Sequence, residues 1–447
     1  MQEESTKLTR TSRIATFSTT LADCTQYRRL IPIFTVSIAA GAIALAAVSN
    51  AYADEPSSGS NSHLSVAPQE VIDEISGHEL EDLEALADQK GISLDTAIIE
   101  YSWRDDFSFA AQAIREKFPD TFAGAEIKDM NDVRINFTGP APDEALNILN
   151  EFERRFRSLE IATDVHTEAN LSERDLKAAI EGAHYAVLEA SEVRDASTSY
   201  VSEKRQVRVS VELGKAGTEE DIADLQDVAS QGVDAAIGQP GIESITTRVT
   251  ESSSPTLGRK HTSSSHYGGE TLSDCTSGFG TLSPGGVRGI ATAGHCSDAQ
   301  SDDGYGLTFR SKHEGTHGDF QWHTGPMNHS NGFYAGSDTT NEANLRYVSS
   351  VGLPTTGLSL CRNGAVSNKD CQEVRRLHVC NGSYCNLVQM GQKLSTFGDS
   401  GGPYYWDQAA YGLHHGDMYD PSFPYDRDLF SRADEIGSAL GVYIATN

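Results

Sequence analysis

Cysteine is unevenly distributed along this chain, and this constrains its architecture more than any other feature. Of its 7 cysteines, Cys24 lies near the N-terminus and the other six lie between residues 275 and 385. An even number of cysteines confined to one part of a chain is typical of a disulfide-bonded, exported domain. The sequence therefore predicts at least two bodies, of which only the last carries disulfides. Spacing alone does not choose among the pairings.

Charge divides the chain at the same place. The formal net charge is −29, which argues against nucleic acid as a partner because no Lys/Arg cluster is available for phosphates. Residues 54–254 hold 17 Lys+Arg against 42 Asp+Glu, whereas residues 255–447 hold 13 against 19. The Ser252-Ser253-Ser254-Pro255 stretch separates the two. We therefore expect a strongly acidic segment and a nearly balanced last domain.

The first 53 residues are typical of a targeting segment. Arg28-Arg29 precede an apolar run from Leu30 to about Val48, and Ala51-Tyr52-Ala53 follows. A basic flank, an apolar core and an A-x-A site predict a signal peptide cleaved after Ala53. The alternative is an uncleaved membrane anchor, since the run is nearly long enough to span a bilayer. We expect a secreted, extracellular protein without stable membrane association, exported by the general secretory or the twin-arginine route.

The acidic segment, residues 54–254, predicts a flexible leader and two α+β subdomains at about 68–171 and 172–250. Apolar residues at three- and four-residue steps predict helices, including one over 143–156 and one over 219–237. Alternation predicts strands over 132–137, 206–212 and 242–249. The histidines of this segment are scattered, so we expect no catalytic cluster in it.

Gly398-Asp399-Ser400-Gly401-Gly402-Pro403 is the most unusual stretch of the last domain. Glycines so close together cost backbone entropy, which is tolerable where the chain needs unusual dihedral angles or close approach. A nucleophilic serine needs both, with nearby backbone N–H groups free to bind an oxyanion. A glycine-rich surface turn is the alternative. The choice depends on whether the chain also supplies a base and an acid.

A candidate base lies upstream, in a region of short alternating runs and turns typical of β-sandwiches and barrels. Val287–Thr292 predicts a strand that leads into Ala293-Gly294-His295-Cys296. A disulfide at Cys296 would fix the loop that carries His295. Alone, His295 could equally be an ordinary surface histidine.

Together, Thr292-Ala293-Gly294-His295-Cys296 and Gly398-Asp399-Ser400-Gly401-Gly402-Pro403 resemble the motifs of chymotrypsin-like serine peptidases, and the domain resembles their secreted bacterial streptogrisin and α-lytic branch. The resemblance covers roughly Tyr267 to the end. It implies an all-β fold, a double six-stranded antiparallel barrel with a short C-terminal helix, expected over Asp428–Ala439. It also implies that residues 54–254 are an α+β pro-region that assists folding and inhibits the enzyme until maturation between Thr250 and Gly268.

The acid of the triad is expected between the two motifs. Asp298, Asp302 and Asp303 follow the histidine too closely, and Asp338 and Asp370 lie in loop-like sequence. Asp319 opens an alternating strand, Asp319-Phe320-Gln321-Trp322-His323, in which a buried carboxylate could face His295. It also occupies the family's order of histidine, aspartate and serine. We therefore expect Asp319 as the orienting acid.

The resemblance implies the remaining roles. Ser400 would be the nucleophile and His295 the base, with the N–H groups of Gly398 and Ser400 as the oxyanion hole. It implies the disulfides Cys275–Cys296 and Cys361–Cys371, which leave Cys380–Cys385 as a local pair. It also implies an ion pair between Asp399 and Arg362.

Specificity is expected to depend on the residues before the serine and on the strand beside the substrate, namely Leu394, Ser395, Phe397, His414, His415 and Gly416. No acid lies in Lys393-Leu394-Ser395-Thr396, which disfavours cleavage after Lys or Arg. We expect an apolar residue before the scissile bond, and the two histidines leave a preference for glutamate as the alternative. The half-cystine usual just upstream of the serine is missing from 392–397.

One motif points to different chemistry. His313-Glu314-Gly315-Thr316-His317 fits the H-E-x-x-H zinc pattern, which requires a helix. Glycine inside the motif disfavours a helix, so we expect no metal and no cofactor in catalysis. The sequence as a whole predicts a monomeric serine endopeptidase acting on proteins or peptides. A catalytically inactive homologue that only binds, and a membrane-anchored zymogen, are the alternatives.

Overall fold

The computed structural model describes residues 67–202, 206–213, 219–237, 265–326, 328–336, 341–420 and 425–447. The predicted signal peptide, nearly all of the leader, the strand over 242–249 and most of the maturation region lie outside these residues. Within the described ranges, no helix is long and apolar enough to cross a membrane.

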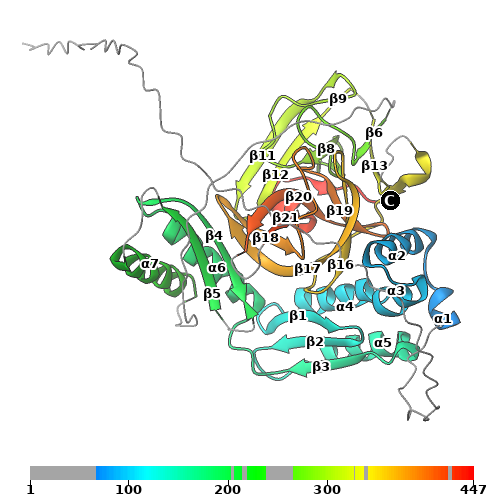
Figure 1. The fold of residues 1–447 in the computed structure, drawn as a ribbon, viewed down its shortest axis with the longest axis horizontal. Coiled ribbons are helices and arrows are strands. Elements are labelled where there is room, and N and C mark those ends of the chain that lie inside the picture. Colours follow the sequence, from blue (N-terminus) through cyan, green and yellow to red (C-terminus); the bar gives the residue numbers. More distant parts are fainter. Residues whose placement is uncertain are drawn as a thin grey trace, which may run out of the picture. The chain divides into compact units, whose positions relative to one another are not determined.

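The first part of the acidic segment packs helices against a small sheet (Figure 1). Ser76 and Ser93 accept hydrogen bonds from the first-turn N–H groups of their helices, and the left-handed Gly91 (φ 67°) ends the longer one. The sheet order is β1-β2-β3, with β3 parallel to β2. The elements are α1 (Gln69–Ile72), α2 (Gly77–Lys90), α3 (Leu94–Tyr101), α4 (Arg104–Lys117), β1 (Phe122–Asp129), β2 (Asp132–Phe137), α5 (Asp143–Arg155) and β3 (Ala162–His166).

The second part is a β-hairpin covered by two helices. Its elements are α6 (Glu173–Leu188), β4 (Val193–Val201), β5 (Gln206–Leu213) and α7 (Glu219–Ile237). Gly182 and Gly232 lie at the crossing of the helices, where a Cβ on either would overlap the backbone of the other. The predicted strands over 132–137 and 206–212 and the helices over 143–156 and 219–237 are confirmed to within a residue. The sequence patterns missed β1, β3 and β4.

The last third is rich in strands, as predicted. One set forms a ring in which every neighbour is antiparallel, in the order β16-β19-β20-β21-β18-β17, and β17 pairs back to β16. Its strands are β16 (Ser359–Gly364), β17 (Asn368–Asn381), β18 (Tyr384–Met390), β19 (Pro403–Trp406), β20 (Ala409–Tyr419) and β21 (Asp426–Arg432), and β15 (Ser350–Val351) pairs with β20.

The other strands of this third form an open five-stranded sheet, a separate three-stranded sheet and a short hairpin of β9 with β10. They are β6 (Ser265–Gly268), β7 (Gly280–Leu282), β8 (Arg288–Thr292), β9 (Ser301–Asp302), β10 (Tyr305–Gly306), β11 (Thr308–Gly315), β12 (Gly318–Thr324), β13 (Asn328–Tyr334), β14 (Leu345–Tyr347) and β22 (Tyr443–Ile444). The pairings of the described residues thus close one six-stranded ring, and the second barrel stays a prediction.

The short C-terminal helix is present, but its predicted start at Asp428 is wrong. Residues 428–432 belong to β21, and the chain becomes α-helical only at α8 (Ile436–Leu440). The physical reason is tertiary. Strand β21 is hydrogen-bonded on both sides, to β18 and to β20, and Asp428 through Arg432 are all buried. Burial on both faces removes the alternation that marks a strand in sequence.

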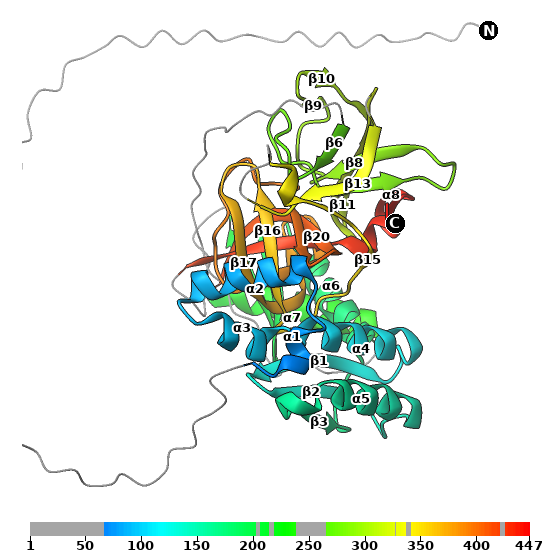
Figure 2. The ribbon, with the colours of Figure 1, turned by 90° about the vertical axis from the view of Figure 1, so that its right-hand side faces the viewer.

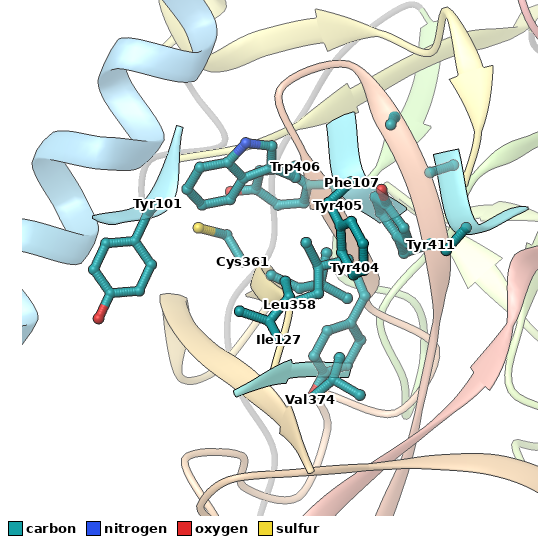
Figure 3. Close-up of a cluster of buried hydrophobic side chains, with 14 of the residues drawn as sticks. Tyr101, Phe107, Ile127, Leu358, Cys361, Val374, Tyr404, Tyr405, Trp406 and Tyr411 are labelled. Atoms are coloured by element: carbon teal, nitrogen blue, oxygen red, sulfur yellow. The ribbon is translucent and has the colours of Figure 1, made fainter. Parts of the chain in front are cut away.

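The acidic segment and the last third share one hydrophobic core. Figure 3 shows Tyr101, Phe107 and Ile127 of the acidic segment in one cluster with Leu358, Tyr405 and Trp406. Helix α2 packs beside β17, as both ribbon views show (Figures 1 and 2). Strand β4 also pairs with the end of β17, with Thr198 opposite Cys380 and Ser197 opposite Asn381. The acidic segment therefore extends the sheet of the last third.

Candidate active site

Ser400 lies in the turn between β18 and β19, and its neighbours fix the shape of that turn. Gly398 (φ 97°) and Gly401 (φ 85°) adopt backbone angles that side chains disfavour. A Cβ on Gly401 would also overlap Oγ1 of Thr292, which belongs to the strand before His295. The N–H of Gly401 donates to the carbonyl of His414 (2.7 Å), which ties the turn to β20. The two glycines are thus required by their backbone angles, and Gly401 also by the close approach of Thr292.

His295 follows β8, and the structure brings it to both Ser400 and Asp319. Its Nε2 lies 3.0 Å from Oγ of Ser400, and its Nδ1 lies 2.5 Å from Oδ2 of Asp319. The backbone N–H of His295 donates to the other oxygen of Asp319 (2.9 Å). Asp319 therefore holds the ring and the main chain of His295 together. About a third of the His295 side chain is exposed, which leaves it reachable from solvent.

Asp319 is the second residue of β12 and is fully buried. Burial by itself raises its pKa, but hydrogen bonds from His295 and His415 outweigh this and lower the pKa well below its ordinary value. Burial lowers the pKa of His295, and the hydrogen bond and charge of Asp319 more than compensate, so this pKa is raised. The pair thus favours an ionised carboxylate beside an imidazole that accepts a proton readily.

The N–H groups of Gly398 and Ser400 form no hydrogen bond with any other described residue. The carbonyl of Gly398 accepts from Oγ1 of Thr276 (2.7 Å), and the carbonyl of Ser400 accepts from the N–H of Thr276 (2.8 Å). Both carbonyls therefore accept hydrogen bonds, while neither N–H group has an acceptor in the part of the chain that the structure describes. Such a pair of donors next to a serine hydroxyl is suited to bind an oxyanion.

The ion pair expected for Asp399 has the expected partner within reach. Arg362 and Asp399 are both fully buried, with Nη1 3.0 Å from Oδ2. Backbone N–H groups of Val366 and Ser367 donate to Oδ1 (3.0 and 3.1 Å), and that of Thr396 donates to Oδ2 (2.8 Å). Burial raises the pKa of Asp399, but Arg362 and these donors lower it overall. The charge next to Ser400 is thus compensated inside the fold.

The six residues expected to set specificity are not equivalent in the structure. Phe397 is 44% exposed, whereas Leu394, Ser395 and Gly416 are half-buried. His414 is buried, and burial together with Arg362 lowers its pKa well below the ordinary value. His415 is also buried, and its Nδ1 lies 2.7 Å from Oδ2 of Asp319. His415 is therefore a further partner of the buried aspartate, a role that its place in the sequence did not indicate.

Asp428 is a second residue that the sequence reasoning missed. It is fully buried in β21 and accepts hydrogen bonds from the N–H groups of Leu394 and Ser395 (3.0 and 3.2 Å), from Oγ of Ser395 (2.5 Å) and from Nε2 of Gln372 (3.0 Å). It thus anchors the segment before Ser400, which has no cysteine between residues 392 and 397. Reading 428–439 as a helix hid this carboxylate.

The remaining sequence candidates also have definite places. The three disulfides in the structure are Cys275–Cys296, Cys361–Cys371 and Cys380–Cys385. His313 and Glu314 lie on β11 and His317 lies in the turn after it, so these histidines do not share a helix face. Nδ1 of His317 is 2.7 Å from a carboxylate oxygen of Glu435. The H-E-x-x-H pattern is therefore part of a β-hairpin.

Several solved structures are similar to this chain. They include a Nocardiopsis protease (21% identity, TM-score 0.35, 40% of this chain and 98% of that one) and Thermobifida fusca protease A (21%, 0.34, 40% and 98%). A third is described as a glutamic acid specific serine protease that uses a histidine triad in substrate binding (23%, 0.34, 40% and 100%). These are bacterial chymotrypsin-like serine proteases. No protein-family model and no curated protein matches the chain.

The electrostatic coupling of His295 to Asp319 can be measured directly. In a chain carrying Ser400→Ala, the substitution Asp319→Asn should lower the pKa of His295, because the negative charge that outweighs burial is lost. An NMR titration of the His295 imidazole reads this shift.

Asp298→Asn is the matched control, since Asp298 also follows His295 in sequence but is exposed and lies near Lys312 (3.6 Å). It should leave the titration of His295 almost unchanged. Equal shifts in the two variants would contradict a specific role of Asp319.

Proposed function

We propose that this protein is a secreted serine endopeptidase made as a zymogen. The observation that carries the proposal is a chain of hydrogen-bond contacts among three residues. Oγ of Ser400 lies 3.0 Å from Nε2 of His295, and Nδ1 of His295 lies 2.5 Å from Oδ2 of the buried Asp319. This arrangement matches the serine, histidine and aspartate roles of acyl-transferring peptidases. The hydroxyl, the base and the acid come from three separate places in the chain. A glycine-rich surface turn would have no reason to bring these three groups together.

The proposed chemistry proceeds in two steps. Oγ of Ser400 attacks the scissile carbonyl while Nε2 of His295 takes its proton, and the oxyanion forms against the N–H groups of Gly398 and Ser400. His295 then protonates the leaving amine, which leaves an acyl-enzyme on Ser400. Water, deprotonated by His295, hydrolyses the acyl group and restores the hydroxyl. Asp319 holds the ring orientation and stabilises the imidazolium in both steps.

Labelling with a fluorophosphonate tests the proposal. The matured protein should acquire one adduct on Ser400, found by mass spectrometry of its peptides, and Ser400→Ala should acquire none. Asp319→Asn should lower kcat by a factor of about 10⁴, because the imidazole loses its orientation and its stabilised charge. A matured protein that is folded but takes no label would instead favour a homologue that only binds.

The surroundings of the site support an apolar preference over a preference for glutamate. A glutamate side chain would need a positive or donating group in the pocket. His415 is committed to Asp319, and its ring packs on Tyr384 (centroids 4.6 Å apart). His414 is buried, and its lowered pKa disfavours the cationic form that would attract a carboxylate most strongly. Asp428 accepts hydrogen bonds from four groups of the fold, so it does not offer a free charge to a lysine or arginine.

Cleavage of a mixed protein substrate reads this preference. New C-termini identified by mass spectrometry should be enriched in apolar residues such as leucine, methionine and phenylalanine. The same mixture incubated with the Ser400→Ala protein supplies the background. Enrichment of glutamate at the new C-termini would contradict the apolar assignment while leaving the peptidase proposal intact.

We further propose that residues 54–254 are a pro-region that helps the last domain to fold, with residues 1–53 as the signal peptide. The support is a chain of contacts at the tip of the β17–β18 hairpin. Nε2 of His184 donates to the carbonyl of Gly382 (2.7 Å), and its Nδ1 lies 2.9 Å from Oγ1 of Thr198. Tyr384 in the same hairpin packs on His415, which contacts Asp319. Ordering this hairpin would therefore help to order the triad.

His184→Ala should lower the yield of active enzyme from refolding of the full chain, with little change in kcat of the molecules that mature. Burial lowers the pKa of His184 to about 4. The folded state disfavours protonation of His184, whereas the unfolded chain takes up this proton near the ordinary pKa of 6.5. The folded state therefore keeps its full stability above pH 6.5 and loses stability as the pH falls from there toward 4. Refolding yield, measured by labelling of Ser400, should fall over this window.

His166→Ala is the control, because His166 is half-exposed and contacts only the neighbouring Asp164 among its described neighbours. It should refold like the parent chain. A His184→Ala yield equal to that of the control would remove the proposed role of this contact.

A further inference from the structure

Four groups of metal-binding side chains have converging donor atoms within the described residues. Two of them contain disulfide cysteines, whose sulfur atoms are already bonded, and one is His295 with Asp319 and His415. The fourth, formed by His266, Glu270 and Asp302, belongs to none of the machinery described above. We call it the buried acid–histidine cluster.

The cluster joins three separate pieces of chain. His266 lies in β6, Glu270 follows that strand, and Asp302 lies in β9, six residues after Cys296. One nitrogen of His266 and one carboxylate oxygen each of Glu270 and Asp302 all lie within 4.8 Å of one another. All three side chains are at most 2% exposed. Distances of this size are compatible with a shared ion after small side-chain movements, since Zn²⁺ binds such atoms at about 2.0–2.2 Å.

Imidazole groups at the cluster lack the hydrogen bonds that buried nitrogens normally make. Nδ1 of His266 pairs with Oδ2 of Asp302 and lies 4.0 Å from Glu270, whereas its Nε2 is buried without a hydrogen-bond partner among the described residues. His329 of β13 stacks on His266 with centroids 5.3 Å apart, and its two nitrogens are buried without a described partner. Unsatisfied buried groups of this kind require an explanation, and a bound ion is one.

The composition of the cluster favours a cation. Glu270 and Asp302 bring two buried carboxylic acids to one place, with the imidazole of His266 between the same pieces of chain. The backbone N–H of Tyr267 donates to Oε2 of Glu270 (3.0 Å), which holds this side chain in position. A divalent ion would compensate the negative charges of both carboxylates.

We propose that His266, Glu270 and Asp302 form a binding site for a divalent transition metal ion, with Zn²⁺ as the best match. One imidazole and two carboxylates are a donor set suited to zinc, whereas calcium and magnesium prefer oxygen ligands alone. His329 is the further imidazole beside these three. The site is separate from the proposed peptidase chemistry and is structural in character.

Its place in the fold indicates what the metal would do. Strand β6 pairs with β13, with His266 opposite His329, and it lies at the end of the region where maturation is predicted. Asp302 belongs to the short β9–β10 hairpin, which follows the Cys275–Cys296 disulfide next to His295. The ion would therefore fasten the start of the last domain to the loop behind His295. Metal binding to a folded site adds to folding stability.

The test uses the full chain carrying Ser400→Ala, which removes self-cleavage and makes the result independent of peptidase activity. After treatment with a chelator, the protein is dialysed against Zn²⁺ and then against buffer, and its metal content is measured by plasma mass spectrometry. We expect one zinc ion per chain. Zinc at 100-fold excess over Kd should raise the thermal midpoint by roughly 5 °C.

Asp302→Asn and Glu270→Gln preserve shape while removing charge, and each should reduce zinc content to below a tenth of an ion per chain. The matched control is His313→Ala with His317→Ala, which removes the H-E-x-x-H histidines and should leave zinc content unchanged. Zinc lost only in this control would assign the ion to the hairpin motif and overturn the proposal. A parent chain that binds no zinc would overturn it as well.

Folding of the variants is checked by circular dichroism in the presence of chelator. If they unfold, Co²⁺ bound to the parent chain gives a second measurement, since its visible absorption reports ligand type and coordination number. Bands typical of nitrogen and oxygen ligands that disappear on addition of Zn²⁺ support the site, and their absence contradicts it. Failure to label Ser400 would bear on the proposed peptidase and not on this site.

Discussion

A buried negative charge at Asp319 is the constraint on which the arrangement of the last third depends. A carboxylate without access to water is tolerated only where donors surround it. The donors come from the turn after β8, through the backbone and the ring of His295, and from β20, through His415. Ser431 of β21 accepts the backbone N–H of Asp319 itself (2.9 Å). The hydrogen bonds of this one residue, three at its carboxylate and one at its backbone N–H, therefore connect the segments carrying β8, β12, β20 and β21.

The same principle recurs at Asp399 and Asp428. Both carboxylates are fully buried and accept several hydrogen bonds. The donors to Asp428 lie just before Ser400, and those to Asp399 lie both there and just after strand β16. Asp428 holds Leu394 and Ser395 from β21, and Asp399 holds Thr396 and pairs with Arg362. Charge-assisted hydrogen bonds thus fasten the segment just before Ser400. Loss of such a carboxylate would leave backbone N–H groups without partners.

The acidic segment is linked to this network through packing and strand pairing. Its side chains share a hydrophobic cluster with β16 and β19, and Cys380 and Cys385 are buried in a second cluster with side chains of α6, α7 and the β4–β5 hairpin. The β17–β18 hairpin is thereby held from one side by the acidic segment and contacts His415 on the other. This arrangement gives a physical basis for the proposed folding role, since strands far apart in sequence are slow to pair unaided. The proposed zinc site would stabilise the beginning of the last third, where its first strand, β6, lies.

The sequence by itself predicts a division into an acidic segment and a last domain, and it predicts the β-rich character of the last third. It also singles out Ser400, His295 and Asp319, which the structure brings together. Glycines, periodicity and the order of two motifs are local signals, and they do not depend on what packs where. Only the tertiary structure shows that His415 contacts Asp319 and that Asp428 anchors the segment before Ser400. It also shows that residues 428–432 form a strand. The reason is that a carboxylate or an imidazole acquires its role from donors and charges on other strands. Contacts across a sheet leave no periodic trace in the sequence of either partner.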